Sequence, residues 1–477
     1  MTIVEKIVAH RKDRVAREGY WLGARPRETR DLPVARFGAD PFLVCEVKRR
    51  SPSKGDIAPE IDVVDQARAY AAAGVRSISV LTEEDNFSGS LDDLERIKRA
   101  LPGVAVLRKD FLLDEEDIEV SWRAGADAVL LIASILDERT LVSLHRAARD
   151  RGLSALVEIH SASDVERCRS LAPELVGINC RDLATFHVDL AHPLVLRPLV
   201  DWTTRLVFES GIRGPEDVSF ALSGGFDGVL VGETAMRSVG SVPGLLASFG
   251  SPAGDFWMRL YTRKKQGRPL VKVCGITRVQ DAETAIALGA DALGFVMAPS
   301  KRRASLELVR ALADIDALKV AVVVTERNNG ALRLDPDVRT ALDEGLVNAV
   351  QFHGEEQPDE CAALAFPYYK AVRVKGAADV ESMGRYHCPR VLADAWSADA
   401  AGGTGKRIPE ELAKAAGDRA PLWIAGGIGP ENVGEVVRTL RPELIDASSK
   451  LEAGSGVKDA DKLKVFFEEI QRNAETE

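Results

Sequence analysis

The feature that most constrains the fold of this chain is a recurring pair: a short apolar run followed by a charged, helix-forming segment. The apolar runs have the length of buried strands, and the segments between them are long enough for helices. This alternation is typical of βα units around a parallel sheet. Eight runs occur in each half of the chain, and eight parallel strands close a barrel. The sequence therefore predicts two tandem (β/α)₈ barrels of the TIM class.

Each predicted strand is a mostly apolar run that ends near a glycine or a polar side chain. In the first half the predicted strands are Phe42–Lys48, Ser77–Leu81, Val104–Arg108, Ala128–Ile132, Ala155–Glu158, Leu175–Ile178, Leu206–Phe208 and Gly228–Val231. In the second half they are Leu270–Cys274, Ala292–Val296, Val320–Val324, Ala349–Phe352, Tyr369–Val372, Val391–Asp394, Leu422–Ala425 and Leu444–Ala447. A charged amphipathic extension precedes the first strand and is predicted to be helical from Ile3 to Glu18.

A segment rich in breakers and charges marks the boundary between the two predicted barrels. It contains Gly-Ser-Pro-Ala-Gly and then Arg-Lys-Lys-Gln-Gly, a composition that favours a linker. We therefore predict a first barrel with its helical extension over residues 1–251, a linker over 252–268 and a second barrel over 269–477. A single α/β barrel reaches about 250 residues, so this chain holds two with little to spare.

Composition and charge exclude several classes of function. The net charge is −10, whereas binding to a phosphate backbone requires a basic surface, so nucleic acid is not an expected partner. The six cysteines are scattered without a Cys-x-x-Cys pair, which predicts neither a zinc site nor a disulfide framework and fits a reducing, cytoplasmic compartment. Neither the apolar core of a signal peptide nor a run of about 20 apolar residues that would span a membrane is present. We expect a soluble monomer that uses no metal or cofactor.

A faint repeat near the end of each half indicates phosphate binding. The first half carries Glu-Ser-Gly-Ile-Arg-Gly-Pro-Glu-Asp-Val and the second Ala-Gly-Gly-Ile-Gly-Pro-Glu-Asn-Val, each followed by another strand. Loops after the last two strands of a barrel commonly build a phosphate site, and glycine lets backbone amides approach the oxygens. One copy would be equally compatible with a tight βα turn, but two copies at matching positions favour phosphate. The glycines concerned are Gly211, Gly232, Gly426 and Gly427.

Polar and ionisable residues gather at the ends of the strands predicted in the first half. Glu46 and Lys48 alternate on one strand, so their side chains point to the same side. Active sites of this fold occupy the face where the strands end, and charges there are costly unless paired or used. Salt bridges that only stabilise the barrel mouth are an alternative for any single residue, but they explain a convergent set poorly. The other members of the set are Lys109, Glu158, Asn179, Arg181, Glu209 and Ser210.

The run Glu-x-Lys-x-x-Ser-Pro-Ser-Lys-Gly that starts at Glu46 resembles the indole-3-glycerol-phosphate synthase family. This pattern is highly specific to the family, and the resemblance extends to about residue 248. It implies ring closure of 1-(o-carboxyphenylamino)-1-deoxyribulose 5-phosphate with loss of carbon dioxide and water. By the family's pattern Lys109 is the general acid and Glu158 the general base. Lys48 holds the anthranilate carboxylate and assists proton transfer.

The resemblance also implies the surroundings of the substrate. Phe111 and Leu183 supply an apolar wall for the anthranilate ring. Two residues depart from the family's pattern: Cys180 stands for a second asparagine, and Glu233 stands where many members have serine. The carboxylate of Glu233 would repel a phosphate, so its side chain is expected to point away and leave the backbone N–H to bind. The expected substrate-binding residues further include Glu46, Ser51, Asn179, Arg181, Glu209 and Ser210, and the expected phosphate-binding residues are Gly211, Gly232 and Glu233.

A thiol and a carboxyl end two of the strands predicted in the second half. Cys274 ends the first of them and Asp394 the sixth. A strand-end cysteine is usually only a small buried apolar residue. Here Ser-Lys-Arg302-Arg, Gln-Phe-His353-Gly-Glu-Glu and Gly402-Gly-Thr-Gly-Lys follow other strands of the same half. A thiol and a carboxyl across a barrel mouth can act as base and acid, provided that a cation or a helix N-terminus lowers the thiol pKa.

These motifs resemble the phosphoribosylanthranilate isomerase family over nearly the whole second half. The specific ones are Lys-x-Cys-Gly-Ile-Thr, Gln-Phe-His-Gly-Glu-Glu and Gly-Gly-Thr-Gly-Lys. The resemblance implies an Amadori rearrangement with Cys274 as general base and Asp394 as general acid. It further implies that Arg302 binds the anthranilate carboxylate and that His353 lines the site, although a structural role for this histidine is almost equally supported. The residues expected to bind phosphate are Gly426, Gly427, Ser448 and Ser449.

One departure separates the second half from the isomerase pattern. The family usually has Ser-Ser-Gly-Val-Glu at the last strand, and this chain has Ser-Ser-Lys450-Leu-Glu. Loss of the glycine crowds the phosphate amides, whereas the lysine adds a cation. The Gly-Gly-Thr-Gly-Lys run lacks the spacing of a nucleotide P-loop, because Arg407 follows its lysine, and this excludes ATP binding.

The sequence as a whole favours a bifunctional enzyme of tryptophan synthesis acting on small phosphorylated, anthranilate-derived substrates. One alternative is an active synthase barrel joined to a non-catalytic barrel that serves binding or assembly, and only Lys450 supports it. Another is a pair of sugar-phosphate barrels from a different pathway, which the Ser-Pro-Ser-Lys-Gly run disfavours.

Overall fold

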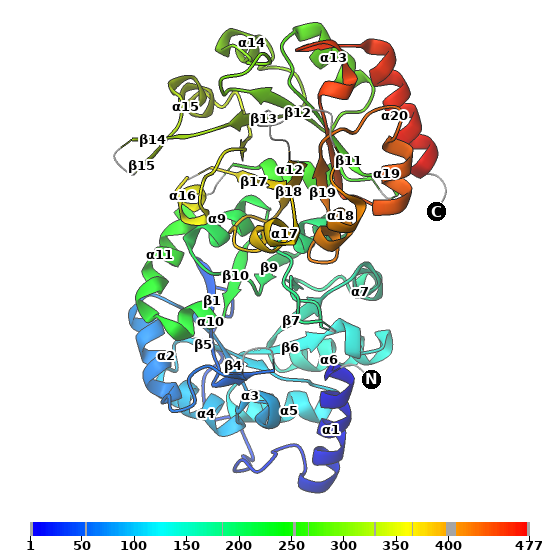
Figure 1. The fold of residues 1–477 in the computed structure, drawn as a ribbon. Helices are drawn as coiled ribbons and strands as arrows, with labels where there is room; N and C mark the ends of the chain where they lie inside the picture. The colour runs from blue at the N-terminus through cyan, green and yellow to red at the C-terminus, as the bar shows by residue number, and fades with distance from the viewer. Residues whose placement is uncertain are drawn as a thin grey trace. The chain divides into compact units, whose positions relative to one another are not determined.

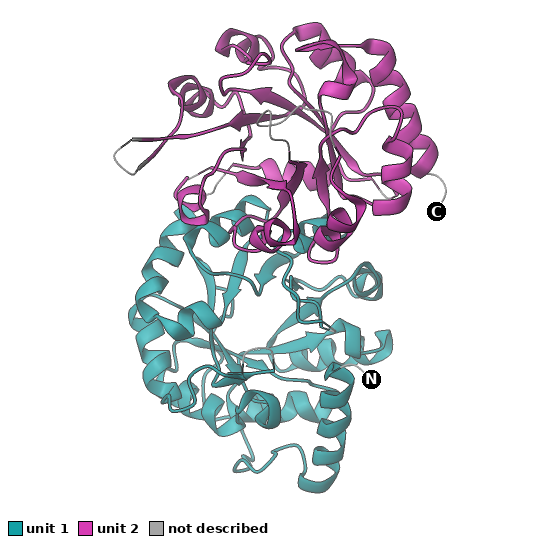
Figure 2. Ribbon diagram, viewed as in Figure 1, with its two compact units in different colours: residues 1–252 teal, residues 253–477 magenta. Residues whose placement is uncertain are grey.

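The computed structural model describes residues 3–52, 55–183, 185–250, 254–265, 267–328, 331–364, 366–396 and 407–474. The chain divides into two compact units, residues 1–252 and residues 253–477 (Figure 2). Each unit contains a closed barrel of eight parallel strands with helices around it (Figure 1). The predicted fold class, two tandem (β/α)₈ barrels, is confirmed.

The first barrel closes because its first strand pairs in parallel with both the second and the eighth. Its strands are β1 (Phe42–Val47), β4 (Ser77–Leu81), β5 (Ala105–Lys109), β6 (Ala128–Ile132), β7 (Ser154–Ile159), β8 (Leu175–Asn179), β9 (Arg205–Glu209) and β10 (Gly228–Val231). A short hairpin, β2 (Arg50–Ser51) with β3 (Gly55–Asp56), follows the first strand. The α-helices of this unit are α1 (Ile3–Glu18), α2 (Val63–Ala72), α3 (Glu84–Phe87), α4 (Leu91–Ala100), α5 (Glu115–Ala124), α6 (Glu138–Asp150), α7 (Ala162–Cys168), α8 (His192–Leu196), α9 (Pro215–Ser223), α10 (Glu233–Arg237) and α11 (Val242–Ala247).

Apolar side chains fill the interior of the first barrel below its mouth. The ring of Phe42 packs edge-on against Phe37 with 5.8 Å between centroids, and Gly228 leaves the space that this ring occupies. The strands are buried along almost their whole length, as expected for a parallel sheet covered by helices. This packed floor leaves only the ends of the strands available for a site.

The N-terminal extension forms α1 over the residues predicted to be helical, Ile3–Glu18. Its Arg11 is buried and forms ion pairs with Asp110, at 3.1 Å, and with Asp117, at 2.7 Å. Asp110 directly follows Lys109 at the end of β5. The extension is therefore anchored beside a residue predicted to be catalytic.

The second barrel closes in the same way, since β11 pairs with both β12 and β20. Its strands are β11 (Leu270–Cys274), β12 (Ala292–Val296), β13 (Leu318–Val323), β16 (Ala349–Phe352), β17 (Tyr368–Val374), β18 (Val391–Ala395), β19 (Trp423–Ala425) and β20 (Leu444–Ala447). Two hairpins lie outside the barrel: β14 (Glu326–Asn328) with β15 (Ala331–Arg333), and β21 (Glu452–Gly454) with β22 (Val457–Lys458). The α-helices are α12 (Phe256–Thr262), α13 (Val279–Ala287), α14 (Leu306–Ala311), α15 (Pro336–Asp343), α16 (Pro358–Ala362), α17 (Ala377–Met383), α18 (Glu410–Gly417), α19 (Val433–Leu440) and α20 (Ala460–Ala474). None of the helices in the described part of the chain has the length and apolar character needed to cross a membrane.

Part of the segment expected to be a linker is a packed helix. α12, Phe256–Thr262, belongs to the second unit and has four buried side chains. Trp257 packs against Trp423 of β19, with ring centroids 5.7 Å apart, and the Tyr261 hydroxyl donates a hydrogen bond to Glu443 at 3.0 Å. Within this segment α12 therefore packs against the second barrel.

Candidate active sites

Lys109 lies at the mouth of the first barrel, where β5 ends. Its Nζ is 3.0 Å from Oε2 of Glu158 on β7 and 2.6 Å from Oε2 of Glu209 on β9. Burial lowers the pKa of Lys109, but the two carboxylates outweigh it and raise the pKa above its usual value. The lysine is therefore an ammonium at neutral pH.

The two carboxyls that contact Lys109 have opposite ionisation behaviour. Burial raises the pKa of both, but the charge of Lys109 holds the pKa of Glu158 well below its ordinary value. Burial raises the pKa of Glu209 to about 8, with the neighbouring Glu158 acting in the same direction. The imidazole Nε2 of His160 lies 3.2 Å from the other oxygen of Glu158, Oε1. Titratable groups whose environments separate their pKa values are suited to acid–base chemistry.

Lys48 and Glu46 form a further ion pair at the mouth of the first barrel. Glu46 lies on β1 and Lys48 directly follows this strand, with 2.6 Å between Nζ and Oε1. Gly232, after β10, allows this arrangement: a Cβ there would lie 2.6 Å from each of these two atoms. Any larger residue at this position would displace the pair.

The remaining residues predicted for the first site lie in the loops around this mouth. Asn179 ends β8, and its side-chain oxygen accepts a hydrogen bond from the backbone N–H of Arg181 at 3.0 Å. The guanidinium of Arg181 donates to a backbone carbonyl in the same loop at 3.2 Å. Phe111 and Leu183 are half-buried after β5 and β8, and Ser51 is buried in the β2–β3 hairpin. The structure thus gathers polar groups and two apolar side chains at one end of the barrel.

The loops after the last two strands of the first barrel have the features expected of a phosphate site. Ser210 and Gly211 both have positive φ, +70° and +76°, where a side chain is disfavoured and glycine is favoured. The hydroxyl of Thr234 donates to the carbonyl of Ile212 at 2.7 Å and ties the loop after β9 to α10. The carboxylate of Glu233 pairs with Arg237, one turn along α10, at 2.8 Å. The side chain of Glu233 is thereby held along the helix.

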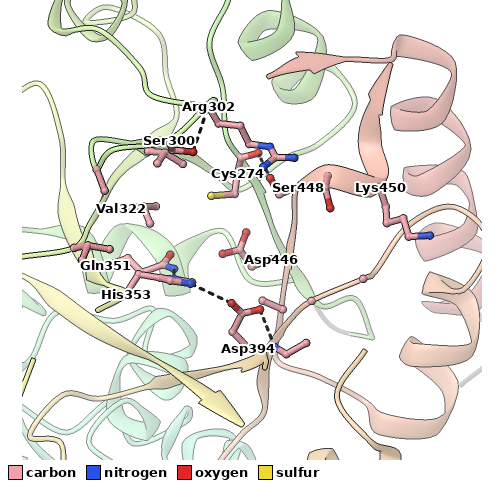
Figure 3. Close-up of a pocket in the computed structure, with 18 of the residues that line it drawn as sticks. Cys274, Ser300, Arg302, Val322, Gln351, His353, Asp394, Asp446, Ser448 and Lys450 are labelled. Carbon is pink, nitrogen blue, oxygen red and sulfur yellow. Dashed lines mark hydrogen bonds and ion pairs between the residues drawn. The ribbon is translucent and has the colours of Figure 1, made fainter. Parts of the chain in front are cut away.

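The second barrel has a cavity of about 400 Å³ at the ends of its strands (Figure 3). Figure 3 shows the side chains of Cys274, His353, Asp394 and Asp446 facing this cavity. The predicted residues that line it are Cys274, Arg302, His353, Asp394, Gly426, Gly427, Ser448 and Ser449. Gln351, Asp446 and Lys450 line it as well.

Asp394 is held in place on one wall of this cavity. Its Oδ2 lies 3.1 Å from Nε2 of His353, and its Oδ1 accepts the backbone N–H of Ala395 at 2.8 Å. The other ring nitrogen of His353 lies 2.9 Å from the amide nitrogen of Gln351. The carboxyl therefore lies beside a histidine whose Nδ1 contacts Gln351, while Nε2 of this histidine makes no hydrogen bond within the described part of the chain. A carboxyl and an imidazole this close can serve as a positioned acid or base.

A buried network next to the cavity surrounds Lys272. Its Nζ donates to Oε1 of Gln351 at 2.5 Å and to Oδ2 of Asp446 at 2.6 Å. The hydroxyl of Tyr369 donates to the same amide oxygen at 2.9 Å. Within the described part of the chain, Oδ1 of Asp446 is buried without a hydrogen-bond partner. A carboxyl oxygen left unsatisfied beside a cavity is available to a ligand.

The carboxylate of Glu452 binds one edge of the Arg302 guanidinium through two hydrogen bonds. Nε of Arg302 lies 2.8 Å from Oε1, and Nη2 lies 2.9 Å from Oε2. Lys458 Nζ lies 3.2 Å from Oε1 of Glu452 and donates to the carbonyl of Ser448 at 3.1 Å. The side-on contact through Nε and Nη2 leaves Nη1 of Arg302 available for a second carboxylate.

Two turns and one exposed ion pair form the end of this cavity where a phosphate is expected. Gly426 and Gly427 follow β19 and have φ of +94° and +61°, a backbone conformation that favours glycine. The hydroxyl of Ser448 donates to the carbonyl of Cys274 at 3.0 Å and joins the loop after β20 to β11. The ammonium of Lys450, at the position where the family pattern has glycine, lies 2.9 Å from Glu431. The charge of Lys450 is therefore already paired with a carboxylate at the protein surface.

The Gly-Gly-Thr-Gly-Lys run at 402–406 lies outside the described residues. In the part of the chain that the structure describes, no group of three or more His, Cys, Asp or Glu side chains is placed to hold a metal ion. All six cysteines have free thiols.

Comparison with known proteins assigns a family to each barrel. Residues 4–241 match the family model described as indole-3-glycerol phosphate synthase, and residues 271–469 match that of N-(5'phosphoribosyl)anthranilate (PRA) isomerase. A multifunctional tryptophan biosynthesis protein from Phanerodontia chrysosporium is 30% identical over 564 residues, which cover 99% of this chain and 70% of that protein. The chain belongs to both families. Its first barrel is the synthase-family barrel and its second the isomerase-family barrel.

Further relatives show the same division. A multifunctional tryptophan biosynthesis protein from Schizosaccharomyces pombe is 32% identical over 468 residues, or 90% of this chain and 59% of that protein. The chain therefore spans less than two thirds of that relative's length. An indole-3-glycerol phosphate synthase from Geobacillus kaustophilus is 41% identical over 258 residues, covering 53% of this chain and 99% of the relative. That match corresponds in extent to the synthase-family barrel alone.

Several groups near the two sites are not among the residues predicted from the sequence. In the synthase-family barrel the residue that the sequence did not predict is His160, beside Glu158. In the isomerase-family barrel the residues that the sequence did not predict are Lys272, Asp446 and Glu452. A signal for two of these exists in the sequence, because Lys272 and Asp446 are charged residues inside otherwise apolar strands. Such a residue in a buried strand is costly unless it is paired or used.

Proposed function

We propose that this chain catalyses two consecutive steps of tryptophan synthesis, one in each barrel. The isomerase-family barrel converts N-(5-phosphoribosyl)anthranilate into 1-(o-carboxyphenylamino)-1-deoxyribulose 5-phosphate. The synthase-family barrel then closes the indole ring with loss of carbon dioxide and water. The observation that carries the proposal is that each barrel has its own acid–base set at the mouth, next to glycine-rich turns suited to a phosphate.

In the isomerisation Asp394 is the general acid and Cys274 the general base. Asp394 protonates the ring oxygen of the ribose as the bond from this oxygen to C1 breaks and the anthranilate nitrogen forms an iminium with C1. Cys274 then removes the proton from C2, which gives an enol, and the enol becomes the ketone when C1 is protonated. The two groups line the same cavity, and Nε2 of His353 lies 3.1 Å from the acid. Arg302 presents its free edge to the anthranilate carboxylate. The phosphate is bound by Gly426, Gly427, Ser448 and Ser449.

In the ring closure Lys109 is the general acid that protonates the substrate carbonyl, and Glu158 is the general base. Lys109 keeps its proton beside the carboxylate of Glu158 and the carboxyl of Glu209 until the substrate takes it. Lys48 holds the anthranilate carboxylate in place, and Phe111 with Leu183 forms the wall against the aromatic ring. The positioning groups are Glu46, Ser51, Asn179, Arg181, Glu209 and Ser210, and the phosphate is bound by Gly211, Gly232 and the backbone of Glu233.

The proposal extends to the organisation and setting of the protein. The synthase occupies residues 1–251 and the isomerase residues 269–477, joined by 252–268. Its partners are small phosphorylated substrates, it functions as a monomer in the cytoplasm, and it requires neither metal nor cofactor.

The test is to measure the two reactions separately in the full chain, by anthranilate and indole fluorescence. Cys274→Ala is expected to abolish the isomerase step and leave the synthase rate unchanged, and Lys109→Ala is expected to do the reverse. If wild-type protein shows the synthase rate alone, the second barrel serves only binding or assembly. If either variant loses both rates while remaining folded, the two-site model is wrong.

A further inference from the structure

A buried thiol is a poor base unless something stabilises its charged form. Cys274 ends β11 at the cavity, and burial raises the pKa of its thiol. The proposed base role therefore requires a cation close to the sulfur. Three cations lie near it, and the geometry distinguishes among them.

Lys272 is the cation that shares a strand with Cys274. The two residues alternate on β11, so both side chains point to the same side of the sheet. Both side chains approach Gly294 of β12. A Cβ at this glycine would lie 2.7 Å from Sγ of Cys274 and 2.8 Å from Cε of Lys272. The sulfur and the end of the lysine chain therefore converge on one small space that only a glycine leaves open.

The ammonium of Lys272 is fixed beneath the thiol. It is fully buried, and two acceptors hold it, Oδ2 of Asp446 at 2.6 Å and Oε1 of Gln351 at 2.5 Å. A lysine ammonium has three N–H donors. The third donor has two neighbours that can accept it, the sulfur of Cys274 and the hydroxyl oxygen of Tyr369. The carboxylate of Asp446 keeps the lysine protonated despite its burial.

We propose that Lys272 is a positioning residue that stabilises the thiolate form of Cys274, and that Asp446 and Gln351 fix this lysine under the sulfur. The inference rests on the proposed isomerase function, since a base role for Cys274 is what makes its ionisation matter. The ammonium stabilises the thiolate through its charge and its N–H, whereas the carboxylate of Asp446 repels the same thiolate. Removal of one charge should therefore act in the opposite direction to removal of the other.

The other charged and titratable groups around Cys274 are engaged elsewhere. Arg302 and Lys458 both bind the carboxylate of Glu452, and Lys458 also donates to the carbonyl of Ser448. The remaining groups lie on the surrounding strands or in loops at their ends. Among the residues that the structure describes, the charged and titratable groups around Cys274 are Lys272, Arg302, Lys458, Asp446, Tyr369, Asp394 and His353.

The test measures the ionisation of the thiol directly, without catalysis. Iodoacetamide reacts with thiolates, so the pH midpoint of Cys274 alkylation in the full chain reports the thiol pKa. Peptide mass spectrometry separates Cys274 from the other five cysteines, and the half-buried Cys388 is an internal reference. In Lys272→Met we expect the Cys274 midpoint to rise by about 1–3 pH units, the range for loss of an adjacent opposite charge. In Asp446→Asn we expect it to fall.

An unchanged or lower midpoint in Lys272→Met would overturn the proposal. So would a larger rise in the comparison variant Lys458→Met than in Lys272→Met. Circular dichroism of each variant, compared with that of the wild type, shows whether the isomerase-family barrel has remained folded. If Lys272→Met does not fold because Asp446 is left unpaired, the double variant Lys272→Met/Asp446→Asn replaces it. Its midpoint must then lie above that of Asp446→Asn alone, and equality would overturn the proposal.

Failure of this inference and failure of the proposed function give different results. If Cys274→Ala retains isomerase activity, the thiol is not the base, whatever the alkylation midpoints show. If Cys274→Ala is inactive but Lys272→Met leaves the midpoint in place, the isomerase proposal stands and another group activates the thiol.

Discussion

Glu209 is a buried carboxyl whose ionisation opposes folding near neutral pH. Burial raises its pKa to about 8, so the folded protein holds a proton that the unfolded chain releases. Its contribution to stability is fully present below the ordinary glutamate pKa of about 4.3 and is lost as the pH rises through about 8. Glu209→Gln removes this dependence. We expect its free energy of unfolding to decline less across this range than that of the wild type.

The measurement is guanidinium denaturation at a series of pH values, followed by circular dichroism. Glu60→Gln is the matched control, because Glu60 is exposed in the same unit and its replacement should leave the wild-type profile intact. If Glu209→Gln and wild type lose stability in parallel across this range, Glu209 is ionised in the folded state at neutral pH.

Glu452 is expected to determine how well the isomerase-family barrel binds a carboxylate. It fixes the guanidinium of Arg302 by two short contacts and leaves one edge of it available. Glu452→Gln keeps an acceptor but removes the charge. A hydrogen bond to a charged group contributes about 1.5 kcal/mol or more, so we expect the isomerase KM to rise about tenfold with little change in kcat.

Steady-state kinetics by anthranilate fluorescence separate the two constants for Glu452→Gln. The matched control is Glu431→Gln, which removes the partner of Lys450 in an exposed ion pair, and such pairs contribute little. A fall in kcat at unchanged KM in Glu452→Gln would mean that Glu452 acts on the chemical step and not on carboxylate binding.

The residues at the strand ends could be predicted from the sequence because each is a polar group directly after an apolar run. Lys109 and Glu158 stand out in this way, and they form an ion pair at 3.0 Å. The partners of these residues could not be predicted equally well. Arg302 and Glu452 are 150 positions apart, and nothing local indicates that they pair. Contacts of this kind depend on how the barrel closes, which the local pattern does not encode.

At the scale of elements, strand positions follow from apolar runs, but strand ends depend on pairing. Leu270–Cys274 and Ala292–Val296 are identical in prediction and structure. The strand predicted at Leu206–Phe208 extends to Arg205–Glu209, because its charged terminal residues find backbone partners on β8. A charged side chain weakens the apolar pattern, yet its backbone continues the ladder wherever the neighbouring strand offers a partner.

The helix α12 was not predicted, because the residues on both sides of it are typical of a linker. Glycine, proline and a basic cluster surround Phe256–Thr262 and favour a linker. The aromatic residues inside it nevertheless bury themselves in the second barrel, where Phe256 also stacks on Tyr369 with 6.4 Å between centroids. Burial of large rings outweighs the local preference for an irregular segment.

This packing predicts that α12 stabilises the isomerase-family barrel. Trp257 is 5% exposed and contacts both Phe256 and Trp423. Truncation of a buried aromatic residue to alanine costs about 3–5 kcal/mol. In Trp257→Ala we therefore expect the isomerase rate to be lost at a lower denaturant concentration, while the synthase rate is lost at the wild-type concentration.

Denaturant titration with both activities measured on each sample tests this prediction for Trp257→Ala. The control is Val465→Ala on α20, whose side chain is 44% exposed and whose replacement should change the midpoint little. Equal midpoints for Trp257→Ala and wild type would show that α12 only connects the barrels.

At the scale of the whole molecule, each unit has its own core, its own strand closure and its own set of ionisable groups. The groups around Lys109 all come from the first unit, and those around Cys274 all come from the second. In the described part of the chain no residue belongs to both sets. Substitution at one site is therefore expected to leave the chemistry of the other intact.

Independence of the two sites predicts that two inactive chains restore the pathway when mixed. Cys274→Ala retains the synthase site and Lys109→Ala retains the isomerase site, so neither alone converts N-(5-phosphoribosyl)anthranilate into indole-3-glycerol phosphate. In the mixture, the intermediate made by one chain is released and taken up by the other. We expect indole fluorescence to appear after a lag that shortens as the total protein concentration increases, because the intermediate must first accumulate in solution. The double variant Cys274→Ala/Lys109→Ala, mixed with either single variant, is the control and should give no product. Absence of product from the two single variants, each active in its own step, would mean that the intermediate is not exchanged between chains.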